Sequence, residues 1–102
     1  MSTKYARIIP PVGLPSEWGM NTKAGNDLVG CIVSRLSYSL RQGRDPVRAT
    51  QRFVLDLRRL SRNFSYAEAG SREVREAVYE YVEEHVLRDR DVDLYGIWQK
   101  YL

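Results

Sequence analysis

The segment from Asp45 to Phe64 constrains the fold more than any other, because its pattern fits only an amphipathic helix. Asp45 is a good N-cap residue, and Pro46 suits the first helical position, where its missing N–H is not needed. At about 100° per residue, the apolar side chains fall within one arc. This arc contains Val47, Thr50, Phe53, Val54, Leu57, Leu60 and Phe64. We therefore predict a helix over residues 46–62 with one face in the core.

Two other segments repeat this periodicity. Apolar residues recur at every fourth position from Leu28 to Leu40, which predicts a helix. It should start near Asn26 or Asp27, both good caps, and run to about Gln42, before Gly43. Ser71 can cap a third helix that runs to about Arg88. After the Asp-rich link 89–93, four residues are spaced for a short fourth helix: Leu94, Ile97, Trp98 and Tyr101.

Residues 1–25 contain three of the four prolines and show no helical periodicity. They predict an extended arm, whose apolar residues are too many for a solvated tail, so the arm should pack along its own domain or along a neighbour. The expected fold class is therefore all-α: a small three-helix bundle with an extended Pro-rich N-terminal arm (1–25), one helical domain (26–102) and a short fourth C-terminal helix.

Composition is that of a soluble globular domain, with 43% hydrophobic and 28% charged residues. Cys31 is the only cysteine, which excludes an intramolecular disulfide and a cysteine metal cluster and suits an intracellular, reducing compartment. The apolar runs are too short for a transmembrane segment, and no cleaved targeting segment is expected.

Charge is divided by segment. Residues 35–62 hold eight arginines and two aspartates, a net charge of +6, whereas residues 63–102 hold five basic and nine acidic side chains, a net charge of −4. Such a division directs partners to particular faces of a molecule but supplies no chemistry.

The sequence supplies no recognisable catalytic or metal site. His85 and Cys31 lie on different predicted helices. His85 lies on an apolar stripe and is expected in the core or an interface, with a base, a ligand or a pH switch as the alternative. Cys31 is expected to be a small buried apolar residue. The segment Asp89–Asp93 begins like a calcium loop but continues with Leu94 where glycine is needed. We therefore expect no enzyme, no cofactor and no metal.

Two sets of residues remain as candidates for partner binding. The first is a stripe of arginines on and beside the second helix, for which the alternatives are ion pairs with glutamates of the third helix or plain solvation. The second consists of aromatic residues near the two ends of the chain, for which the alternative is an ordinary core position. The candidates are Arg35, Arg48, Arg52, Arg59, Arg62, Trp18, Trp98 and Tyr101.

The order of helices resembles that of the small LYR-motif proteins of mitochondria. The resemblance rests on the segment Ile32–Arg41, on the Arg-rich segment Leu57–Phe64 and on a third amphipathic helix, and covers about residues 28–88. Arg35 alone carries over from the Leu-Tyr-Arg signature, since the two residues before it are Val and Ser. The resemblance implies a three-helix accessory subunit or assembly factor of respiratory or iron–sulfur machinery, a mitochondrial location and an acidic acyl carrier protein as partner.

Two functions follow as hypotheses. The first is a non-enzymatic accessory or assembly subunit of a larger protein complex, such as a mitochondrial respiratory-chain complex, docked through its arm and its Arg-rich helix face to other protein subunits. The alternative is a small basic RNA- or DNA-binding helical protein, because a basic helix on a helical frame is also typical of nucleic-acid binding.

Overall fold

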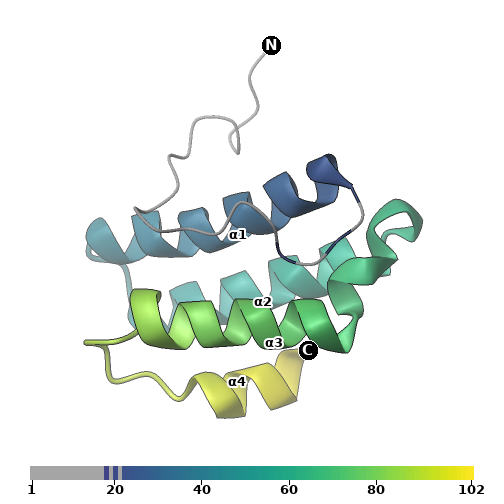
Figure 1. The fold of residues 1–102 in the computed structure, drawn as a ribbon. Helices are drawn as coiled ribbons and strands as arrows, with labels where there is room; N and C mark the ends of the chain where they lie inside the picture. The colour runs from purple at the N-terminus through teal and green to yellow at the C-terminus, as the bar shows by residue number, and fades with distance from the viewer. Residues whose placement is uncertain (1–17, 19, 21) are drawn as a thin grey trace.

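The computed structural model describes residues 18, 20 and 22–102, and every helix found there confirms the all-α class. In Figure 1, α1 (Lys23–Arg41) lies along one side and α4 (Leu94–Tyr101) along the other, with α2 (Pro46–Arg62) and α3 (Arg72–Tyr81) between them. Most of the expected arm, residues 1–17, 19 and 21, lies outside the described residues.

The second helix matches its predicted bounds, and its cap is the predicted one. The Asp45 side chain accepts a hydrogen bond from Val47 N at 3.1 Å, and Pro46 occupies the first turn. Gly43 ends the preceding helix with φ +77°, a left-handed conformation that glycine adopts without steric cost. The turn between α1 and α2 is thus encoded locally.

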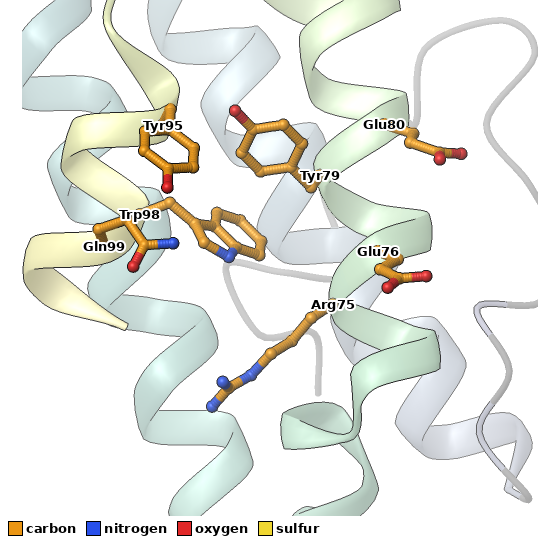
Figure 2. A pocket seen from close by; sticks show the side chains of 7 residues that line it. All are labelled: Arg75, Glu76, Tyr79, Glu80, Tyr95, Trp98 and Gln99. Carbon is orange, nitrogen blue, oxygen red and sulfur yellow. The ribbon is translucent and has the colours of Figure 1, made fainter.

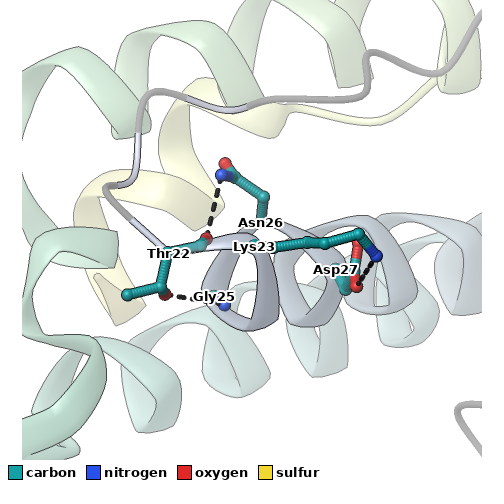
Figure 3. Close-up of polar contacts among 5 residues, drawn as sticks. All are labelled: Thr22, Lys23, Gly25, Asn26 and Asp27. Carbon is teal, nitrogen blue, oxygen red and sulfur yellow. Dashed lines mark hydrogen bonds and ion pairs between the residues drawn. The ribbon is translucent and has the colours of Figure 1, made fainter.

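The first helix starts earlier than the sequence predicted. It begins at Lys23, and Thr22 is its N-cap, with Oγ1 accepting from Gly25 N at 3.1 Å. Asn26, predicted as a possible cap, is instead 5% exposed and binds the chain before the helix: its Oδ1 accepts from Trp18 N at 2.6 Å, and its Nδ2 donates to Met20 O at 3.1 Å. Figure 3 shows the further hydrogen bond from Asn26 Nδ2 to Thr22 O, at 3.0 Å. Asn26 therefore does not cap the helix; it is a buried residue that binds the backbone of residues 18 and 20.

The predicted third helix is divided. After Tyr81 the chain forms a π-helical turn, η2 (Val82–Val86), in which Leu87 N donates to Val82 O at 2.8 Å. Residues five apart lie about 140° apart on an α-helix, and a π turn brings them closer to one face. Both Val82 and Leu87 are buried here, while His85 is turned outward with its side chain 59% exposed. The predicted core position of this histidine is therefore wrong, whereas the other predicted position, in an interface, stays a prediction.

The connection between α2 and α3 is a 3₁₀ helix, η1 (Phe64–Gly70), not a simple loop. Because Asn63 is extended, with φ −74° and ψ 127°, Phe64 leaves the arc of α2 and is 97% exposed. Its predicted place on the apolar face is also wrong. Val47, at the other end of that arc, is 41% exposed.

The core joins all the helices. Fully buried side chains come from α1, α2, α3 and η2; they include Val29, Val33, Val54, Leu57, Val74, Val78 and Val82. Trp18 contacts the Tyr81 ring edge-to-face, with centroids 5.5 Å apart, and Trp98 of α4 lies 6.2 Å from Phe53 of α2. Residues 18 and 20 thus belong to the same core as the helices.

Candidate functional site

The candidate site is the outward side of α2, which we call the arginine face: Arg48, Arg52, Arg59 and Arg62. All four are exposed, as the predicted pattern requires, because the opposite side of α2 supplies the buried residues Phe53, Val54 and Leu57. The burial of these three residues identifies that side of α2 as the side that faces the core.

One buried carboxylate organises part of this face. Asp56 is only 7% exposed and lies within ion-pair distance of three guanidinium groups. The distances are 3.3 Å from Arg52 Nε, 3.9 Å from Arg59 Nη1 and 3.7 Å from Arg35 Nη1, the last of these from α1. Three positive charges share one negative charge, so the cluster keeps a surplus of positive charge at the surface.

The cluster borders a pocket between α1 and α2. The pocket has a volume of about 270 Å³. Leu28 and Ile32 of α1 and Leu60 of α2 supply its apolar wall, and Arg52, Asp56, Arg59 and Asn63 supply its polar wall. The exposed ring of Phe64 follows directly after Asn63. Cations, a fixed carboxylate and apolar surface therefore meet in one place.

The alternative prediction was that the arginines form ion pairs with glutamates of the third helix, and the ion pairs among the described residues differ from it. The arginine-face residues that pair, Arg52 and Arg59, do so with Asp56 of their own helix. On α3, Glu76 accepts a hydrogen bond from Arg72 Nε at 2.8 Å, within the same helix. Among the described residues, no ion pair joins the arginine face to a glutamate of α3 or η2.

The other candidate residues are placed apart from this face. Arg35 is partly buried, with its side chain 25% exposed, behind Asp56. Trp18 and Trp98 are 2% and 9% exposed within the chain's own core, and Tyr101 is partly buried against that core, with Lys100 Nζ 5.4 Å from its ring centroid. The structure brings the arginines together but does not bring the aromatic candidates to them.

Sequence reasoning missed Asp56 and Phe64. For Asp56 the signal was present: it follows Arg52 by four residues and precedes Arg59 by three, spacings at which side chains meet on a helix. For Phe64 the periodicity was misleading. It places the ring on the apolar face of α2 only if the helix continues past Asn63, where α2 in fact ends.

No family model, curated protein or solved structure matches this chain. The site must therefore be interpreted from its own chemistry.

Groups able to hold a metal or act as a nucleophile are sparse in the described part of the chain. No cluster of three His, Cys, Asp or Glu side chains suited to a metal ion occurs there. Burial, and next the charge of Asp27, raise the pKa of the partly buried Cys31 thiol, which disfavours the reactive thiolate. Within the described residues, no helix is long and apolar enough to cross a bilayer.

Proposed function

We propose that this protein is a non-enzymatic accessory or assembly subunit that docks an acidic surface of a partner protein on the arginine face of α2. The observation that carries the proposal is the Asp56 cluster, in which three guanidinium groups share one carboxylate beside an apolar pocket. Arginine binds carboxylates through two parallel hydrogen bonds, so such a surface selects acidic side chains with defined geometry.

The neighbourhood of the cluster favours a protein partner over nucleic acid. Leu28, Leu60 and the exposed Phe64 offer apolar contacts that a protein surface can cover. The acidic side of α3, with Glu73, Glu76 and Glu80 exposed, would repel a long polyanion that reaches beyond the arginine face.

The resemblance to the LYR-motif proteins extends this proposal to a partner and a location. An acidic acyl carrier protein is the partner that it implies, and a mitochondrial complex is the setting. Arg35, the position shared with the signature, lies behind Asp56 at 3.7 Å, where it supports the cluster. The Pro-rich arm is proposed as a second point of attachment.

A charge-matched pair of variants tests the proposal. Arg48→Gln with Arg59→Gln removes two positive charges from the arginine face, and Arg88→Gln with Arg90→Gln removes two from an exposed segment elsewhere. Tagged protein expressed in its native source is purified, and co-purifying proteins are identified by mass spectrometry. An acyl carrier protein is then titrated directly against each variant.

We expect an acidic partner to be retained by the control variant and lost or weakened about tenfold or more by the face variant, since each charge-assisted contact contributes about 1.5–3 kcal/mol. Binding should fall with added salt. Equal retention by both variants would contradict the proposal. Loss of the partner after nuclease treatment, or salt-dependent binding to duplex RNA that requires Arg48 and Arg59, would support the nucleic-acid alternative instead.

A further inference from the structure

A second groove lies between α3 and α4 (Figure 2). Its volume is about 410 Å³, within the range of about 300–1,000 Å³ that is usual for small-ligand sites. Aromatic rings form much of its wall: Tyr79 of α3 and Tyr95 and Trp98 of α4. None of the four arginine-face residues lines it, so the groove is independent of the proposed function.

The rings of the groove are held in a defined arrangement. The Tyr79 and Trp98 rings meet edge-to-face, with centroids 5.1 Å apart and planes at 86°. Trp98 also packs on Phe53 of the core, with centroids 6.2 Å apart. Tyr95, by contrast, is 65% exposed, so a bound group can reach its ring. Rings placed in this way can bind an apolar or aromatic group by packing.

The guanidinium group of Arg75 lies on the ring side of the groove. Figure 2 shows this side chain below the Trp98 indole, whereas Glu76 and Glu80 are directed away from the rings. Arg75 is half-buried and its Nε is buried, and among the described residues that Nε has no hydrogen-bond partner. The carboxylate of Glu76 is taken by Arg72, at 2.8 Å. A cation that has lost part of its hydration without gaining a partner favours the binding of an anion.

A second hydrogen-bond donor faces the same end of the groove. Figure 2 shows the indole nitrogen of Trp98 on the edge of the ring that is turned toward Arg75. Indole and guanidinium N–H groups donate hydrogen bonds and cannot accept them, so both require an acceptor. A carboxylate has acceptor oxygens only, and its planar shape matches a guanidinium group.

The other end of the groove has the opposite charge. The Tyr79 phenol lies there, far from Arg75 in Figure 2. The pKa of this phenol is raised, first by burial and then by the charge of Glu83, with a smaller effect of Asp93. These carboxylates repel an anion. A ligand with one negative charge would therefore place that charge at the Arg75 end and its uncharged part along the rings.

We propose that this groove binds a small aromatic monocarboxylic acid. Its carboxylate lies between the Arg75 guanidinium group and the Trp98 indole N–H, and its ring packs against Tyr79 and Tyr95. Charge-assisted hydrogen bonds from Arg75 select the acid over neutral molecules of the same shape. One guanidinium group balances one carboxylate, and the acidic end of the groove opposes a second negative charge on the ligand.

The test uses an acid and its neutral isostere, with the two described tryptophans as internal reporters. Hydrocinnamate and hydrocinnamamide are each titrated into the ¹⁵N-labelled full chain. We expect the indole N–H signal of Trp98 to shift and saturate with the acid, while that of Trp18, buried against Tyr81, stays in place. The acid should bind about tenfold more tightly than the amide, because hydrogen bonds to a charged group are stronger than neutral ones.

A matched pair of variants tests the role of Arg75. Arg75→Gln should reduce the preference for the acid to about twofold or less without changing the affinity for the amide. Arg72→Gln removes the same charge from an exposed neighbour outside the groove lining and should preserve the preference. An unchanged Trp18 signal verifies folding. Arg75→Lys keeps the charge without the planar fork, so it should retain part of the preference even if Arg75→Gln alters the fold.

A variant of the exposed ring tests the packing. Tyr95→Ala should weaken the acid and the amide alike, because the two probes share the group that contacts the ring. Equal affinity for acid and amide, an unchanged Trp98 signal, or the same loss of preference in Arg72→Gln as in Arg75→Gln would overturn the proposal.

Two further measurements separate other occupants of the groove. If N-acetyl-Ala-Ala-Phe with a free carboxylate bound about tenfold or more tightly than hydrocinnamate, the occupant would be the C-terminus of a protein, and the proposal of a small ligand would be overturned. Groove signals that move with protein concentration in the absence of ligand would identify a second copy of this chain and would also overturn it. None of these outcomes affects the arginine face, so the two proposals fail separately.

Discussion

Replacement of Asn26 by alanine should cost more stability than most single changes in this protein. The Asn26 side chain makes four hydrogen bonds to the chain that precedes α1: Oδ1 accepts from Trp18 N at 2.6 Å and from Met20 N at 3.4 Å, and Nδ2 donates to Met20 O at 3.1 Å and to Thr22 O at 3.0 Å. These groups lie in or beside the core, where water replaces a lost hydrogen bond poorly.

The expected magnitude follows from these contacts. The bond at 3.4 Å is long and should contribute little. The other three, at about 1 kcal/mol each, give a loss of about 3 kcal/mol in the free energy of unfolding. The adjacent Asp27 provides the control: it is exposed, and its ion pair with Lys23 joins two largely solvated side chains, so Asp27→Ala should change stability by about 0.5 kcal/mol or less.

Urea denaturation, followed by circular dichroism and tryptophan fluorescence, measures both variants. We expect a clearly lower midpoint for Asn26→Ala at an unchanged slope, with the two probes coincident. A loss below about 1 kcal/mol, or a loss equal to that of Asp27→Ala, would refute the reasoning that Asn26 anchors the segment. A change in fluorescence before the helices unfold would show that the segment around Trp18 detaches on its own and is not part of the cooperative core.

Three further predictions can be checked on the isolated protein and its complex. Gly43→Ala should lower the free energy of unfolding by about 1 kcal/mol, measured in the same urea experiment, because its φ of +77° strains any residue with a Cβ even though the surrounding space is open. Phe64→Ser should leave stability within about 0.5 kcal/mol, since the ring is 97% exposed, and yet weaken binding of the acidic partner in the titration described above. Cys31 should be alkylated by iodoacetamide more slowly at pH 8 in the folded chain than in urea, because burial and then the charge of Asp27 raise the pKa of its thiol. The raised pKa means that folding favours the protonated thiol. The stability that this thiol contributes is complete below the ordinary thiol pKa and is lost as the pH rises through the raised value.

Local signals in the sequence determined much of the helical framework. The cap at Asp45, the proline at the first turn and the stop at Gly43 act through neighbouring backbone groups, so α2 and the turn before it could be predicted without the rest of the molecule. The same applies to the arginine face, because a 3.6-residue period separates Arg48, Arg52 and Arg59 from the apolar arc whatever lies opposite.

Tertiary packing decided the remainder. Asn26 reads as a helix cap, but the bound chain around Trp18 makes it a buried anchor, and that contact links residues eight positions apart whose proximity no periodicity encodes. The π turn at Val82–Val86 arises where Val82 and Leu87 both reach the core, and it exposes His85 against the helical pattern. Likewise, Arg35 meets Asp56 only because α1 packs on α2, and the rings of Tyr79 and Trp98 meet only because α4 lies beside α3. Contacts between distant segments depend on the relative position of whole helices, which the pattern within any one helix does not specify.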